Sequence, residues 1–201
     1  MKRLLPEIII LIAIIVTITA LEPYFVNHFF NFKENNTGNS SLTIITGKDI
    51  GDVFLSNKYL GKTPITVNNV SSGVHTLKIT FPSQNSFYSQ FNEVVPFESG
   101  NTTVVKWNPG PSYTFSSGAI YYFKKNYGNN ASLNISLNTK SEIFINGKFA
   151  KTTQSLIKPL LEGSYSITFI SLGFTKKTIE VNLKNGYSLY VNVKLFEIPI
   201  K

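Results

Sequence analysis

The sequence predicts an all-β protein, with two tandem small antiparallel β-sandwich modules after an N-terminal transmembrane helix. Three observations support this fold class. Residues that favour strands are abundant, with 16 Phe and 10 Tyr beside many Val, Ile and Thr, while alanine is scarce. The chain starts with two cations and a long apolar run, and its remainder repeats itself once. A length of 201 residues leaves room for two small domains after that run.

The N-terminal segment has the features of a membrane anchor. Residues 4–26 are long enough to cross a hydrocarbon core of about 30 Å as one helix. Glu7 and Glu22 then lie near the two headgroup layers. The cations of the tip, residues 1–3, favour a cytoplasmic N-terminus and an extracytoplasmic C-terminal part in a single-pass cell-membrane protein.

A cleaved signal peptide is the alternative reading of this segment. Its small-x-small cleavage site is poorly matched, because Ile18 stands three residues before the cleavage point that would follow Ala20. A buried soluble helix is disfavoured because the run has no polar face. Residues 27–40 are rich in polar residues, so we expect a flexible spacer there.

An internal repeat divides the rest of the chain into two copies, predicted at residues 41–108 and 131–201. With a shift of 90 positions and no gap, identical or similar residues coincide: Phe54 with Phe144, Lys58 with Lys148, Thr63 with Thr153, Gly73 with Gly163, and Leu77 with Ile167. Alternating apolar positions between turn signals predict five or six short strands in each copy. Asn146-Gly147 is a strong hairpin signal within the second copy.

Residues 109–130 connect the two copies. The segment begins and ends like a linker, but Ala119–Phe123 is an unbroken apolar run. Such a run would be unfavourable in water. We therefore expect one packed strand here and a semi-rigid pair of modules.

The triplet Gly61-Lys62-Thr63 also occurs at the end of phosphate-binding P-loops. That motif needs a glycine five residues before Gly61, where this chain has Ser56, and it must open a helix. Pro64 and the β-favouring residues after it indicate an extended chain instead. We interpret the triplet as part of a turn.

The stretch from Asp52 to Thr80 resembles a PEGA domain, on the strength of Gly61-x-Thr63-Pro64 and Gly73-x-His75 at this spacing. The second copy resembles a diverged member, with Gly147, Gly163 and Gly173 at corresponding places. The Pro-Glu-Gly-Ala signature itself is missing. The resemblance implies a β-sandwich module of bacterial and archaeal envelope proteins, without an agreed catalytic residue or ligand.

The residues offer little for catalysis. Cysteine is absent, which excludes disulfides, thiolate metal sites and a lipid-modified cysteine. His75 lacks a nearby acid or serine elbow, and no calcium-loop motif occurs. We expect no enzyme activity, no metal and no cofactor, and His75 in a structural role. A hydrolase remains a less favoured alternative.

Positive charge is concentrated in the second copy, which has nine lysines against four acidic residues between 131 and 201. Short lysine pairs are not a nucleic-acid tract, and export makes nucleic acid an improbable partner. The charge serves either solubility or attraction to an anionic polymer. The candidate contacts for such a polymer are Lys148, Lys151, Lys158, Lys176, Lys177 and Lys184.

The sequence therefore indicates a membrane-anchored, non-catalytic cell-envelope protein whose modules serve scaffolding, spacing or adhesion. The alternative is a binding module for an anionic or carbohydrate cell-wall polymer. The expected partners are the membrane, through the N-terminal helix, and an envelope protein or wall polymer.

Overall fold

A computed structural model of the chain describes residues 39–82 and 88–199. No helix capable of crossing a bilayer occurs within these ranges. The predicted anchor at residues 4–26 lies outside them, as does most of the predicted spacer at residues 27–40.

The described residues form only strands and connections, as the sequence predicts, and no helix. The strands are β1 (Ser40–Ile45), β2 (Asp52–Leu55), β3 (Lys58–Lys62), β4 (Ile65–Val70), β5 (Gly73–Thr80), β6 (Phe91–Phe97), β7 (Thr102–Asn108), β8 (Ser117–Lys125), β9 (Ala131–Ile145), β10 (Lys148–Leu160), β11 (Gly163–Ile170), β12 (Lys177–Leu183) and β13 (Tyr187–Lys194).

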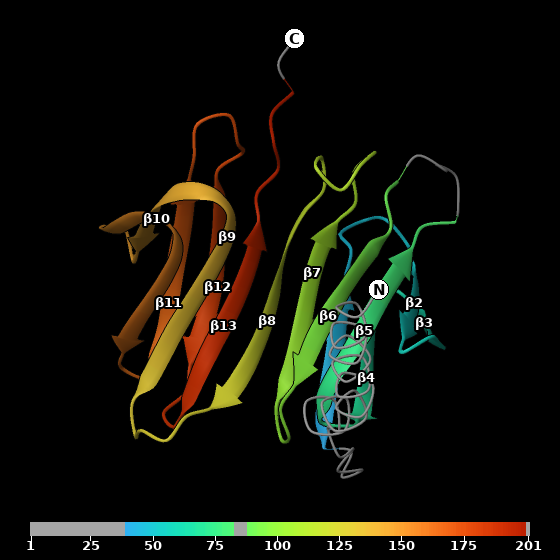
Figure 1. Cartoon of the computed structure of the whole chain (residues 1–201), viewed down its shortest axis with the longest axis horizontal. Helices are drawn as coiled ribbons and strands as arrows, with labels where there is room; N and C mark the ends of the chain where they lie inside the picture. The colour runs from blue at the N-terminus through green and yellow to red at the C-terminus, as the bar shows by residue number, and fades with distance from the viewer. Residues whose placement is uncertain (1–38, 83–87, 200–201) are drawn as a thin grey trace, which may run out of the picture. The chain divides into compact units, whose positions relative to one another are not determined.

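Two sheets account for all of these strands. The larger sheet has nine strands in the order β12-β11-β9-β13-β8-β7-β1-β4, with β10 paired to β9. The smaller sheet has the order β3-β2-β5-β6. Figure 1 shows β8 between β13 on one side and β7 on the other, so that the larger sheet runs without a break from the first half into the second.

The two halves contain corresponding strand pairs. In the first half β2 pairs with β5, β5 with β6, and β1 with β7. In the second half β9 pairs with β11, β11 with β12, and β9 with β13. The pairs β1–β4 and β2–β3 correspond to the two ends of the single long pair β9–β10.

The halves differ in how the first strands are divided. In the first half a loop after Ile45 separates β1 from β2, which lie in different sheets. In the second half β9 continues through this region, and its odd-numbered residues are buried almost throughout. Because alternate residues of a strand point to one face, β9 keeps one face on the core along its length while it pairs first with β13 and then with β11.

Most strand pairs are antiparallel, as predicted, but β1–β7 and β9–β13 are parallel. The expectation of purely antiparallel modules is wrong for these two pairs. Each of these parallel pairs joins the first strand of its half to the last one. Parallel strands need a crossover connection, and here the strands between the first and the last form that connection.

Two hydrophobic cores lie on opposite faces of β8. Ile120 belongs to the core of the first half, and Tyr122 packs against that core. Ala119 belongs to the core of the second half, with Tyr121 and Phe123 packed against it. A strand that is covered on both faces needs a continuous apolar run rather than an alternating one, which explains the composition of residues 119–123.

Candidate functional site

A turn is predicted at Gly61–Pro64; Gly61 and Lys62 belong to β3, and Thr63 and Pro64 make the connection to β4, held by a buried threonine hydroxyl. Thr63 is 3% exposed, and its backbone N–H donates to the carbonyl of Gly51 over 2.9 Å. Its Oγ1 accepts a hydrogen bond of 2.9 Å from the N–H of Gly51 and contacts the hydroxyl of Thr46. The Thr63–Pro64 peptide bond is cis, and the chain continues into β4 rather than a helix. These contacts tie the β1–β2 loop to the β3–β4 turn.

His75 uses both ring nitrogens in local contacts. Its Nε2 lies 3.0 Å from the carbonyl oxygen of Ser71, which only accepts, so Nε2 carries the hydrogen. The Nδ1 atom lies 3.1 Å from Oγ of Ser56 and then accepts from it. The ring packs edge-on against Phe97 at 5.4 Å between centroids. Two serine hydroxyls, from Ser56 and Ser71, and one backbone carbonyl thus surround the ring, and no carboxylate is among these contacts.

The motif glycines lie at turns and strand starts, except Gly61, which lies within β3 beside a register shift of its pairing with β2. Gly61, Gly73, Gly147, Gly163 and Gly173 all have positive φ angles. At Gly147 the requirement is clearest, because Asn146 (φ 49°) and Gly147 (φ 75°) form the two-residue turn between β9 and β10.

The six candidate lysines form two groups rather than one patch. Lys148, Lys151 and Lys158 lie on β10. Lys176, Lys177 and Lys184 lie at the start of β12 and just beyond its end. The strands β9 and β11 separate β10 from β12 in the sheet order.

Lys177 is half-buried, unlike most of this set. Burial, and then the positive charge of Lys106, lower the pKa of Lys177. Lys106 lies on β7 of the first half, so a charge from that half acts on Lys177 at the start of β12.

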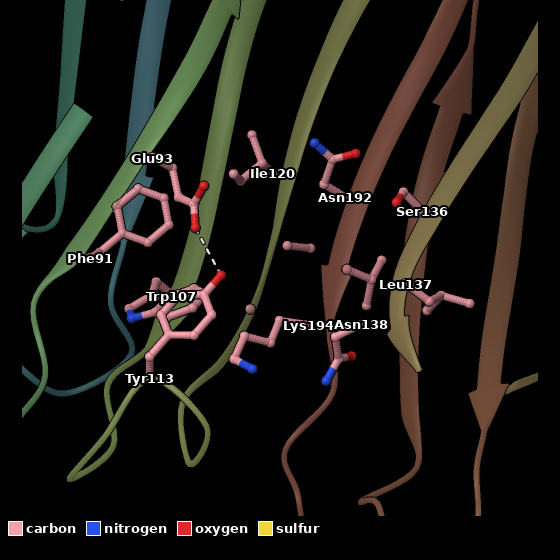
Figure 2. Close-up of a pocket in the computed structure, with 13 residues that line it drawn as sticks. Phe91, Glu93, Trp107, Tyr113, Ile120, Ser136, Leu137, Asn138, Asn192 and Lys194 are labelled. Carbon is pink, nitrogen blue, oxygen red and sulfur yellow. Dashed lines mark hydrogen bonds between the residues drawn. The ribbon is translucent and has the colours of Figure 1, made fainter. Parts of the chain in front are cut away.

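A cleft beside β8, which we call the β8 cleft, is the most promising site among the described residues. Its cavity has a volume of about 290 Å³. One wall comes from the first half, with Phe91 and Glu93 on β6 and Tyr113 in the β7–β8 loop. The opposite wall comes from β9 and β13 of the second half, as Figure 2 shows.

The floor of the β8 cleft depends on a close approach at Gly118. In the larger sheet Gly118 is paired with Trp107 on one side and Lys194 on the other. A Cβ atom at Gly118 would lie 2.4 Å from Cε3 of Trp107 and 2.4 Å from the carbonyl oxygen of Lys106. The indole therefore lies directly over the glycine, and a larger residue would push it into the cleft.

Two ionisable groups of opposite sign face the β8 cleft. The Tyr113 hydroxyl donates to Oε1 of Glu93 over 2.8 Å (Figure 2). Burial, followed by the hydrogen bond to Glu93 and its charge, raises the pKa of Tyr113 to about 12, so this tyrosine is a neutral donor at pH 7. Nζ of Lys194 lies 4.5 Å from the centroid of the Tyr113 ring. Burial lowers the pKa of Lys194, while the carboxylates of Glu197 and Glu93 oppose that effect.

Amides and hydroxyls complete the second wall. The side chain of Asn138 is fixed, because its Nδ2 donates to the carbonyl of Leu195 and its Oδ1 accepts from the Leu195 N–H. Asn192 and Ser136 are exposed on neighbouring positions of β13 and β9. Among the described residues the Ser136 hydroxyl has no side-chain hydrogen bond, so it is available to a ligand.

The cleft presents hydrogen-bond donors and acceptors around an apolar floor, an arrangement that can bind a polar ligand. In residues 39–82 and 88–199 no group of three His, Cys, Asp or Glu side chains could hold a metal ion.

Sequence reasoning missed the β8 cleft because its walls are distant in the chain. Glu93 and Lys194 are about a hundred positions apart, and they meet because β13 pairs with β8 while β6 of the smaller sheet packs against β7 and β8. One local signal existed. Asn134, Ser136 and Asn138 alternate with buried leucine and isoleucine, which marks a polar outer face on β9.

Comparisons with known proteins agree with one part of the sequence analysis. Residues 39–109 match the family described as PEGA domain, which supports a PEGA domain-containing protein. The predicted resemblance of the first copy is thereby confirmed. A search of curated proteins found no match.

Two solved structures show a distant likeness. The minor pilin GBS52 of Streptococcus agalactiae is 11% identical, with a TM-score of 0.29, and the match covers 81% of this chain and 97% of that one. The Bacillus anthracis TIE protein is 15% identical, with a TM-score of 0.25, and the match covers 79% of this chain and 34% of that one. Scores this low carry no argument about fold or function.

Proposed function

We propose that this chain is a non-catalytic cell-envelope protein that displays a semi-rigid pair of β-sandwich modules outside the membrane. Residues 4–26 form its anchor and residues 27–40 its spacer. Residues 41–108 and 131–201 form two PEGA-like modules, the second one diverged, and residues 109–130 connect them. The modules act as a scaffold, a spacer or an adhesion surface.

The observation that carries this proposal is the position of β8 between the two halves. Eight residue pairs link β8 to β13, from Gly118–Lys194 to Lys125–Tyr187, and five pairs link β8 to β7. A connector bonded on both edges and covered on both faces resists bending between the modules. Such resistance suits a protein that holds a binding surface away from the membrane.

Corresponding strand pairs in the two halves support the assignment of the second module. Leu77 on β5 and Ile167 on β11 are related by the sequence repeat, and both are fully buried. The PEGA domain match in the first half is consistent with a non-catalytic surface protein.

Binding of a cell-wall polymer is the second candidate function, and the β8 cleft favours it. The cleft is lined by polar groups from both halves, among them the exposed Ser136 and Asn192. The lysines proposed for an anionic polymer are instead divided between β10 and β12.

Membrane fractionation and protease accessibility test the proposed location. The full chain with a C-terminal epitope tag should fractionate with membranes, and external protease should remove the tag from cells whose outer layers have been opened. A control that lacks residues 4–26 should be soluble and protected inside the cell. A soluble wild-type product that begins near Leu21 would indicate a cleaved signal peptide, and a wild-type tag that stays protected would contradict export.

A further inference from the structure

The β8 cleft carries no net charge. Its lining holds one carboxylate, Glu93, and one ammonium group, Lys194. Lys194 would attract an anionic ligand, but Glu93 would repel it. A cationic ligand would be attracted by Glu93 and repelled by Lys194. The charges therefore favour an uncharged ligand.

The polar groups of the β8 cleft both donate and accept hydrogen bonds. The amide of Asn192 and the hydroxyl of Ser136 have both capacities. Glu93 accepts one hydrogen bond from Tyr113 and retains further lone pairs, while Lys194 donates. The hydroxyl groups of a sugar match this set, because each of them also donates and accepts.

The size and surroundings of the cavity favour one ring of a longer chain. A volume of about 290 Å³ lies just below the range of roughly 300–1,000 Å³ for small-molecule sites. Beyond the cleft the outer face of β9 continues with Asn134 and Ser132, which alternate with buried residues. A polymer that leaves the cleft along β9 thus meets further amides and hydroxyls.

The apolar part of the cleft is mostly Tyr113, which is 47% exposed, because Ile120 and the indole of Trp107 beneath it are only 9% and 3% exposed. Amphipathic aromatic side chains suit ligands that combine an apolar face with hydroxyl groups.

We propose that the β8 cleft binds one ring of an uncharged polysaccharide, which makes a neutral envelope glycan the ligand of this protein. The inference rests on the second candidate function and gives it a site. Location at the membrane does not depend on it, so the fractionation test and the binding test can fail separately.

Trp107 provides a direct probe, because it is the single tryptophan of the chain and lines the cleft. The full chain, purified in a detergent without a sugar headgroup, is titrated with uncharged glucan, mannan and chitin oligosaccharides and with uronic-acid oligosaccharides of the same length. We expect at least one uncharged series to change Trp107 fluorescence and to give saturable binding in calorimetry. The uronic-acid series should bind more weakly.

The double variant Asn192→Ala with Ser136→Ala removes exposed hydrogen-bonding groups from the cleft. It should weaken binding about tenfold with an unchanged unfolding midpoint. The matched control is Asn92→Ala, an exposed amide on β6 that points away from the face of Glu93 and should leave binding unaltered.

Three outcomes would overturn the inference. The first is an absence of binding by every uncharged oligosaccharide. The second is binding that the double variant leaves intact, because the site would then lie elsewhere. The third is preferential binding of the uronic-acid series that declines as salt rises, which would point to the lysines of β10 and β12.

Discussion

Thr63 shows how a residue of a family motif can act through hydrogen bonds alone. Its hydroxyl is buried and accepts from the N–H of Gly51, while Gly51 itself has no room for a side chain beside Ile79 and Phe81. Both residues are needed where the β1–β2 loop meets the β3–β4 turn. The triplet Gly61-Lys62-Thr63 therefore needs no nucleotide to explain it.

Thr63→Ala should lower the free energy of unfolding by about 1–3 kcal/mol, because a buried backbone donor loses its acceptor. Denaturant unfolding of the full chain measures this effect. Thr66→Ala is the control, since its hydroxyl pairs with Thr43 in an exposed contact and its loss should cost under about 0.5 kcal/mol. Equal effects of the two substitutions would contradict the role given to the Thr63 hydroxyl.

At the scale of elements, β8 shows what the sequence could and could not predict. The apolar run at residues 119–123 indicated a packed strand. Its pairing with β7 is the usual one for consecutive strands, but its pairing with β13 could not be predicted, because β13 lies far along the chain. Hairpin turns such as Asn146-Gly147 could be predicted because their signal is local. The continuation of β9 through Asn138–Ser141 could not be predicted, because these residues have the polar composition of a loop.

Gly118→Ala tests the packing between β7 and β8. The added methyl group would collide with backbone and indole atoms at 2.4 Å, so we expect a loss of stability of about 1–3 kcal/mol and altered Trp107 fluorescence in the folded state. Gly128→Ala is the control, because the closest atom to its added Cβ lies 3.8 Å away. An unchanged indole environment in Gly118→Ala would mean that the floor of the β8 cleft is more adaptable than the structure indicates.

At the scale of the molecule, the β8 cleft exists only because the two halves share a sheet. Its residues carry no recognisable motif, because the first wall mixes aromatic and charged side chains and the second has the composition of an ordinary polar strand face. The repeat in the sequence predicted two similar units, and their strand pairs do correspond. The repeat could not predict how the two halves join, because β8 has no counterpart in the repeat and its pairing with β13 is a long-range contact.

A shared sheet should make the described residues unfold as one cooperative unit, and repeat-related core positions provide the test. Leu77 and Ile167 are both fully buried, one in each core. Replacement of either by alanine should cost about 2–5 kcal/mol.

Trp107 fluorescence reports the first half, whereas far-UV circular dichroism reports strands of both halves. We expect Ile167→Ala to lower the denaturation midpoint seen by Trp107 as much as the midpoint seen by circular dichroism, and Leu77→Ala to do the same. The exposed Ile157→Ala should leave both midpoints in place. If Ile167→Ala shifts only part of the circular dichroism transition and leaves the Trp107 transition unchanged, the halves unfold independently, and β8 is a tether rather than a rigid joint.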